Sequence, residues 1–260
     1  MFRLVFVIAH LGEARILIEK YKLKKDVESS LPLYQNKDRS IFLILTGNNR
    51  SDIIARIAYF AGKNIITDKS ILINLGISGA KDINLGEIVW VNKLESLSDS
   101  NNFFPHKSHK MIIREEGLIS VDNEVNDYPE NGIVDMEGYH FFQAAMKFLN
   151  IEQIAVIKII SDNKQNPAVN VNKEQVYRLF AENWQLIDEL LDHYKNLSIK
   201  LHDLYQKLPE YLFLIKEKKF SFSQKINLEQ NMIKLKHQNK LPDLEMLLNK
   251  SAKEIINLTS

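Results

Sequence analysis

The sequence predicts an α/β fold, in which a sheet of buried strands is flanked by helices and followed by a helical C-terminal extension. Short runs rich in Val and Ile alternate with amphipathic stretches through the first three quarters of the 260 residues. Because these runs are apolar at successive positions, they suit strands that are buried on both faces. Strands are expected at residues 4–9, 41–45, 71–76, 87–91 and 154–160, and helices between them at 12–23, 50–62 and 137–149.

The rest of the chain is predicted to form loops and helices. Residues 95–132 are polar and irregular, which indicates loops with at most short edge strands. A helix is expected at 174–194, and three helical segments near 197–218, 223–238 and 242–257 form the tail. We therefore divide the chain into a main domain, 1–195, and a helical extension, 196–260. The extension is Lys-rich and amphipathic, so we expect it to pack on the main domain or on a second subunit.

Charge and composition argue against several classes of partner. Lys and Arg number 34 against 33 Asp and Glu, so the net charge of +1 gives no general attraction for nucleic acid or anionic membranes. There is no cysteine, which excludes disulfides and thiolate metal sites. The first apolar run ends before Gly12 and Glu13 and is too short to span a membrane. We expect a cytoplasmic protein that recognises a small molecule locally.

One candidate binding segment is the stretch of small residues that follows the predicted strand at 71–76. It contains Gly76, Ser78, Gly79 and Ala80. Small side chains let a ligand approach the backbone at the carboxyl end of a strand, which is where open α/β sheets bind ligands. A plain tight turn explains the same residues without a ligand.

Acidic residues mark two further candidate segments. Asp135 and Glu137 flank Met136 at the start of the helix predicted near 137–149, and Asp162 follows Ser161 at the end of the last strand. Helix capping explains acidic residues in a first helical turn, and turn formation explains an Asp after a strand. Each segment taken alone therefore has an ordinary structural explanation.

The fourth segment joins the first strand to the first helix and contains His10 and Glu13. The order of the four segments resembles the nucleosidase branch of the purine nucleoside phosphorylase superfamily, in the style of the methylthioadenosine/S-adenosylhomocysteine nucleosidases, across about residues 1–195. The matching motifs are Ala9 to Glu13, Asn74 to Gly79, Asp135-Met136-Glu137 and Ile160-Ser161-Asp162.

The resemblance implies a central mixed, mostly parallel twisted sheet and an enzyme that hydrolyses a purine nucleoside. In such an enzyme Asp162 hands a proton to N7 of the departing base, and Glu13 is the general base that activates a water. Asp162 must then retain a proton, which burial at a strand end favours. Ser161 is expected to orient Asp162.

The resemblance also assigns the groups that bind the nucleoside. Glu137 binds the ribose hydroxyls through strong charge-assisted hydrogen bonds, and Met136 packs beneath the sugar. Gly76, Ser78 and Gly79 border the nucleoside and leave room beside it. These residues are candidate substrate contacts rather than catalytic groups.

Two parts of the expected site, around the phosphate and around the base, depart from the family pattern. Phosphorylases place an Arg and a Ser around the glycine segment, where this chain has Asn74 and Ile77, so water is the expected nucleophile. In the base-pocket stretch 117–125, which includes Val121, Glu124 stands where better-known nucleosidases present an aromatic ring. His10 lies next to the expected 5′ end, which points to a 5′ substituent other than methylthio.

No metal or organic cofactor is expected for this mechanism. His106 and His109 share a loop but lack a carboxylate at ligand spacing. The resemblance implies a homodimer. Two alternatives stay open: a phosphorylase that holds phosphate with another basic group such as Arg50, and a non-catalytic nucleoside-binding or scaffold module of the same fold.

Overall fold

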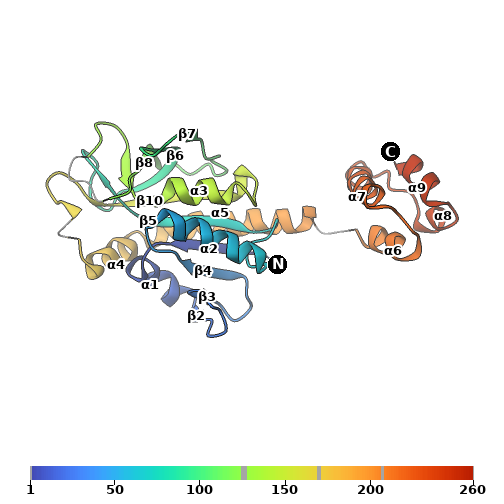
Figure 1. Ribbon diagram of the computed structural model, residues 1–260, viewed down its shortest axis with the longest axis horizontal. Coiled ribbons are helices and arrows are strands. Elements are labelled where there is room, and N and C mark those ends of the chain that lie inside the picture. Colours follow the sequence, from blue (N-terminus) through green and yellow to red (C-terminus); the bar gives the residue numbers. More distant parts are fainter. Residues whose placement is uncertain (1, 124–127, 169–170, 206–207, 260) are drawn as a thin grey trace. The chain divides into compact units, whose positions relative to one another are not determined.

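The computed structural model describes residues 2–123, 128–168, 171–205 and 208–259, with all their side chains except those of residues 202–205 and 237. The chain forms two compact units, Met1–Asp203 and Leu204–Ser260 (Figure 1). Helix α5 (Trp184–Tyr205) runs without a break through the predicted boundary between residues 195 and 196. The first unit therefore includes most of this helix.

The first unit is built on one mixed sheet of ten strands. The order is β10-β6-β8-β9-β5-β1-β4-β3-β2, and β7 pairs with β6. Because β10 also pairs with β5, the strands β5, β10, β6, β8 and β9 close into a ring. The strands are β1 (Leu4–Ile8), β2 (Lys24–Lys25), β3 (Leu33–Gln35), β4 (Ile41–Leu45), β5 (Ile71–Ala80), β6 (Ile88–Ser96), β7 (Asp99–Phe103), β8 (Arg114–Ser120), β9 (Ile133–Asp135) and β10 (Ile154–Asp162).

Strand directions differ from the predicted parallel majority. The pairs β1–β4, β1–β5, β10–β5, β6–β8 and β8–β9 are parallel. The pairs β10–β6, β2–β3, β3–β4, β5–β9 and β6–β7 are antiparallel. The mixed sheet is therefore confirmed, and among the described residues its parallel and antiparallel strand pairs are equal in number. The short connections from β2 to β3, β3 to β4 and β6 to β7 allow only antiparallel pairing, because a parallel pair needs a crossover of about a dozen residues or more.

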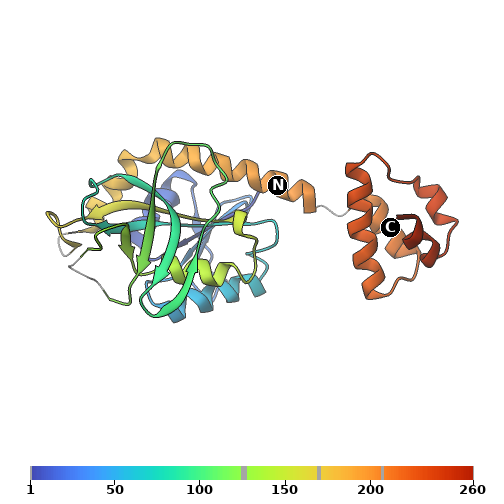
Figure 2. The same ribbon diagram turned by 90° about the horizontal axis from the view of Figure 1, so that it is seen from above.

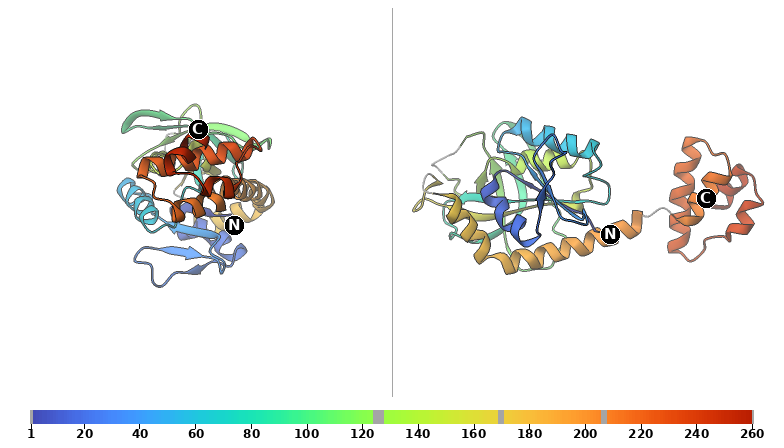
Figure 3. Two further views of the ribbon diagram at one scale, coloured as in Figure 1. Left: turned by 90° about the vertical axis from the view of Figure 1, so that its right-hand side faces the viewer. Right: turned by 90° about the horizontal axis from the view of Figure 1, so that it is seen from below.

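Helices cover the sheet on two sides. Helices α2 and α3 lie on one side, and α1 and α5 lie on the opposite side (Figures 2 and 3). The helix predicted at 174–194 is two helices, α4 and α5, because α4 ends at the cap residue Asn183. The helices of this unit, besides α5, are α1 (Leu11–Lys20), α2 (Arg50–Gly62), α3 (Gly138–Ala145) and α4 (Lys173–Glu182), with a 3₁₀ turn at Ile151–Gln153.

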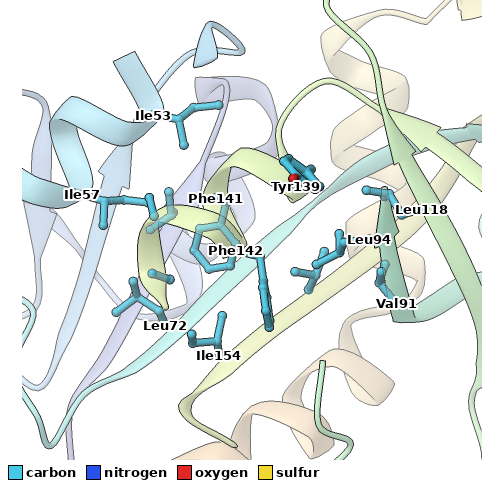
Figure 4. Close-up of a cluster of buried hydrophobic side chains, with 14 of the residues drawn as sticks. Ile53, Ile57, Leu72, Val91, Leu94, Leu118, Tyr139, Phe141, Phe142 and Ile154 are labelled. Carbon is cyan, nitrogen blue, oxygen red and sulfur yellow. The ribbon is translucent and has the colours of Figure 1, made fainter. Parts of the chain in front are cut away.

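A cluster of buried apolar side chains joins α2 and α3 to the ring of strands (Figure 4). Ile53 and Ile57 stand one turn apart on α2, so both face the cluster. Phe141 and Phe142 come from α3, and both are fully buried. Burying an apolar side chain of this size stabilises the fold by roughly 1.5–3 kcal/mol. This packing holds the start of α3 against the sheet.

Two segments differ from their predicted structure. Residues 95–132 were expected to hold loops with at most short edge strands, and this is wrong, since β8 lies inside the sheet between β6 and β9. The first residues of β8, Arg114 and Glu115, are exposed, so the segment lacks an apolar run. The small residues after Gly76 do not turn, because β5 stays extended to Ala80 through its pairing with β10 and β9.

The second unit consists of helices around an apolar core of their own. Pro209 occupies the first turn of α6, where the missing N–H costs nothing, and Ser221 caps α7. The helices are α6 (Pro209–Glu217), α7 (Phe222–His237), α8 (Leu244–Leu248) and α9 (Ala252–Thr259). The core side chains are Leu208, Tyr211, Leu214, Phe220, Leu228, Met232, Leu247 and Ile255. Over the described residues, no helix of either unit is both long and apolar enough to cross a membrane.

Gly132 is expected to be indispensable for the pairing of β8 and β9. Its φ is 89°, and a Cβ there would lie against the carbonyl oxygen of Gly117. We predict that Gly132→Ala lowers the free energy of unfolding by about 2 kcal/mol more than Gly47→Ala. Gly47 has a φ of 69° but nothing within 4 Å, so its substitution costs only the roughly 1–2 kcal/mol of left-handed backbone. Urea unfolding measures both; equal losses would show that the close approach of the strands is unimportant.

Candidate functional site

The candidate site is a cavity of about 450 Å³ where β1, β5, β9 and β10 end. The loop from β1 into α1 and the first turn of α4 form its side. Strand ends converge here because β5 lies between β1 and β10 and pairs with β9 over its last two residues. Four segments that are distant in the sequence therefore deliver polar groups to one place.

Glu13 is buried in the wall of the cavity, with 4% of its surface exposed. Its Oε2 accepts a hydrogen bond from the His10 N–H at 3.0 Å, which is half of a capping box at the start of α1. Its Oε1 accepts from the Ile77 N–H at 3.0 Å. The two amide donors fix the carboxylate between α1 and β5. A carboxylate held this way can accept a proton from a bound water.

Lys158 carries a positive charge into the interior of the sheet. It lies in the middle of β10 and is fully buried. Its Nζ forms an ion pair with Asp135 Oδ2 at 2.6 Å and lies 3.5 Å from Glu137 Oε2. Burial opposes the charge of Lys158, but the carboxylates of Asp135, Glu137 and Glu13 outweigh it and raise its pKa. The lysine therefore remains a cation between three carboxylates.

Glu137 is a carboxyl group of the cavity whose pKa is raised. Its side chain is 12% exposed, and burial raises its pKa, with the negative charges of Asp135 and Glu13 adding to the shift and Lys158 opposing it. Asp135 is held in turn by hydrogen bonds from Ser120 Oγ at 2.6 Å and the Gly138 N–H at 2.8 Å. The junction of β9 and α3 thus places Glu137 at the cavity and Asp135 at the lysine.

Asp162 ends β10, lines the cavity and is 7% exposed. Its Oδ1 accepts from Ser161 Oγ at 2.5 Å, and its Oδ2 accepts from the Tyr128 hydroxyl at 2.7 Å. The predicted contact of Ser161 with Asp162 is present. Because β10 ends here, the carboxyl group reaches the cavity while its strand remains paired with β5.

Most of the predicted site residues line this one cavity. Glu124 lies outside the described residues. Gly76 is not among the lining residues that the structure describes. The lining residues named from the sequence are His10, Glu13, Ile77, Ser78, Gly79, Val121, Asp135, Met136, Glu137, Ser161 and Asp162.

The two glycines of β5 make room for side chains of the site. A Cβ at Gly76 would lie 2.9 Å from Glu13 Oε1 and 3.3 Å from Lys158 Nζ. A Cβ at Gly79 would lie 2.5 Å from both Asp162 Oδ2 and Tyr128 Cε1. Gly76 was expected to leave room beside a nucleoside; its close neighbours are instead Glu13, in the cavity wall, and the buried Lys158.

Three polar residues of this region did not follow from the sequence reasoning. Lys158 had a signal, since it is the single charge in the otherwise apolar run 154–160. Asn48 lines the cavity from the loop after β4, and its Nδ2 lies 3.5 Å from Met136 Sδ. Tyr128 had no signal, because only the fold brings its hydroxyl to Asp162.

The positions of Arg50 and of the histidines bear on the phosphorylase alternative and on metal binding. Arg50 begins α2 and is not among the described residues that line the cavity. Within the described ranges, no three His, Asp or Glu side chains are grouped to hold a metal ion. His109 is buried beside the ring of Trp90, at 4.8 Å between centroids, and burial lowers its pKa to about 4. His106 is exposed.

Removing the charge of Lys158 is expected to destabilise the fold strongly. At pH 7 we predict that Lys158→Met lowers the free energy of unfolding by about 3–5 kcal/mol, because Asp135 loses the cation that pairs with it and becomes an unpaired buried charge. A buried carboxyl group whose pKa is raised stabilises the fold at low pH and loses this contribution as the pH rises. The loss in the variant should therefore shrink toward acidic pH.

Urea unfolding of both proteins between about pH 5 and pH 8 measures this dependence. The matched control is Lys93→Met, since Lys93 forms an ion pair with Glu95 at a site where both side chains are more than one third exposed. The control should change stability by less than about 1 kcal/mol. A Lys158 variant as stable as the control would exclude charge compensation as the role of this lysine.

Comparison with known proteins places this geometry in a known fold. No protein-family model and no curated protein sequence matches the chain. A 5′-methylthioadenosine/S-adenosylhomocysteine nucleosidase from Colwellia psychrerythraea, solved with adenine, is similar over 75% of this chain and 96% of its own, with 17% identity and a TM-score of 0.59.

Two further solved structures extend the similarity. The corresponding nucleosidase from S. pneumoniae, solved with a transition-state inhibitor, is 20% identical over 75% of this chain and 100% of its own, with a TM-score of 0.57. A futalosine hydrolase mutant from Helicobacter pylori is 12% identical over 73% of this chain and 100% of its own, with a TM-score of 0.56. The resemblance predicted from the sequence is thus confirmed for the fold: this chain has the fold of the methylthioadenosine/S-adenosylhomocysteine nucleosidases.

Proposed function

We propose that this protein hydrolyses the N-glycosidic bond of a purine nucleoside of the adenosine type, with water as the nucleophile. The observation that carries the proposal is the meeting of Glu13, Glu137 and Asp162 in one cavity. The similarity of the fold to solved nucleosidases supports it. Asp162 ends β10 at the cavity, while Glu13 and Glu137 lie near the buried cation of Lys158.

Asp162 is the proposed general acid. Cleavage of the bond leaves the electron pair on the base, so a proton delivered to N7 stabilises the leaving group. Val121 and Val134, both buried, line the cavity together with Asp162 and offer an apolar surface to the base. The base then departs as a neutral purine.

Glu13 is the proposed general base. A water held by its carboxylate attacks the anomeric carbon, its oxygen forms the new bond, and one of its protons passes to Glu13. The products are the free base and the free sugar. Asp162 is left without its proton and Glu13 carries one, and exchange with solvent restores both groups.

Glu137 and Met136 are the proposed contacts of the ribose. A carboxylate oxygen of Glu137 accepts hydrogen bonds from the ribose hydroxyls, while Lys158 offsets the negative charge of the wall. Met136 and Ile77 pack against the sugar, Ser78 and Gly79 border the nucleoside, and His10 faces the 5′ substituent at the open end. The identity of that substituent is left open by this assignment.

The proposal extends to the organisation of the molecule. Residues 1–195 constitute the nucleosidase-like domain, and residues 196–260 the helical extension. We propose a homodimer that acts in the cytoplasm, uses neither a metal nor an organic cofactor, and binds a small-molecule nucleoside rather than nucleic acid or a membrane.

The identity of the sugar product tests the reaction class. Incubation with a panel of 5′-substituted adenosines in phosphate buffer should yield free base and free ribose derivative, followed by chromatography and mass spectrometry. A ribose 1-phosphate product would replace hydrolysis by phosphorolysis. Thermal stabilisation by a nucleoside without any product would indicate a non-catalytic binding module.

Substitution of the proposed acid should abolish most of the activity. We predict that Asp162→Asn lowers kcat by about 10²–10⁴-fold, which is the usual contribution of general acid catalysis. The matched control is Asp82→Asn, because Asp82 is exposed and is not among the cavity residues. Steady-state kinetics on the best substrate of the panel measures both variants. Activity of Asp162→Asn equal to that of the control would refute the mechanism.

A further inference from the structure

Tyr128 is a buried residue beside the proposed acid for which the mechanism has so far no use. Its hydroxyl donates to Asp162 Oδ2 at 2.7 Å, and 7% of its surface is exposed. It packs with Val121 and Val134 in a small apolar cluster. It is not among the described residues that line the cavity, so it reaches the cavity only through Asp162.

The direction of the Tyr128 hydroxyl proton is fixed by its surroundings. Among the described residues, Asp162 Oδ2 is the acceptor that lies within hydrogen-bond distance of the hydroxyl. The hydroxyl proton therefore points to Asp162. Burial and the neighbouring Asp162 also raise the pKa of Tyr128, so the phenol keeps its proton. Tyr128 thus acts as a donor to Oδ2.

The other oxygen of Asp162, Oδ1, is paired with the Ser161 hydroxyl, which can either donate or accept a hydrogen bond. Ser161 Oγ donates to Oδ1 at 2.5 Å, but it also lies 3.3 Å from the carbonyl oxygen of Ser78. When the Ser161 proton turns to that carbonyl, the hydroxyl oxygen can accept a proton from Oδ1. Oδ1 can therefore hold a proton without losing its partner, whereas a proton on Oδ2 would confront the proton of Tyr128.

We infer that Tyr128 is a positioning residue of the reaction, which anchors Oδ2 of Asp162 as an acceptor and confines the transferable proton to Oδ1. The inference rests on the proposed function. During turnover the proton moves from Oδ1 to the base, and the hydrogen bond from Tyr128 then stabilises the carboxylate that is left. Gly79 permits this arrangement, since a side chain there would occupy the space of both groups.

The variant Tyr128→Phe tests this role, because it keeps the ring and removes only the hydroxyl. A hydrogen bond to the charged form of an acid favours that form, so its loss favours the protonated form of Asp162. The alkaline limb of the kcat profile should move to higher pH by about one to two units. On the acidic plateau kcat should fall about tenfold, because the acid is weaker and its proton is no longer confined, while KM stays within about twofold.

The matched control is Tyr194→Phe, which removes a phenol hydroxyl from a buried ring packed on Trp90. Its kcat profile should coincide with that of the parent protein. Thermal melting of both variants verifies that they are folded. An unmoved alkaline limb in Tyr128→Phe, or an equal movement in the control, would overturn the inference.

A second measurement does not depend on turnover. In protein labelled with carboxyl-¹³C aspartate, the Asp162 resonance is identified by its disappearance in Asp162→Asn and is followed through a pH titration. Its midpoint should rise by about one to two pH units in Tyr128→Phe. The same midpoint in both proteins would reject the role of Tyr128. A raised midpoint in a protein that cleaves no nucleoside would leave Tyr128 as the anchor of Asp162 and reject the proposed function instead.

Discussion

The structure around the cavity depends on one buried cation, Lys158, which requires acidic side chains beside it. A lysine inside a strand of a closed ring cannot reach water, and a buried charge without partners would cost several kcal/mol. Asp135, at the end of β9, forms an ion pair with it, and Glu137, at the start of α3, lies beside it. Because Asp135 also binds Ser120 on β8 and the first amide of α3, the charge ties three strands and a helix together. The position of the candidate site follows from this compensation.

The same groups serve the fold and the proposed chemistry. Glu13 closes a capping box on α1 and is held by an amide of β5, so the residue that organises the first helix is also the proposed base. Burial raises the pKa of Glu137, and the negative charges of Asp135 and Glu13 add to this cost. Lys158 offsets part of this cost. Stability and function are therefore coupled at these positions, and charge-removing variants test both.

The sequence predicted those parts of the fold whose signal is local. Continuous apolar runs located β1, β4 and β10 to within about two residues, because strands buried on both faces need apolar side chains at every position. The short β8 was missed, since its first half is charged and exposed and only its neighbours in the sheet hold it. The antiparallel pairs β10–β6 and β5–β9 had no local signal for a related reason: they join segments that are distant in the chain.

For the site, the sequence by itself determined the chemistry of the candidate groups and their order along the chain: Glu13, Glu137 and Asp162, each at an end of a strand or a helix. Only the tertiary structure decided which atoms meet. It brought Lys158 between the carboxylates, placed the Tyr128 hydroxyl on Asp162, and put Gly76 behind the cavity wall. The physical reason is that these interactions require side chains to be buried together and brought within contact distance. Both conditions are met only when β5, β9 and β10 close around one interior, so no local pattern of residues can encode them.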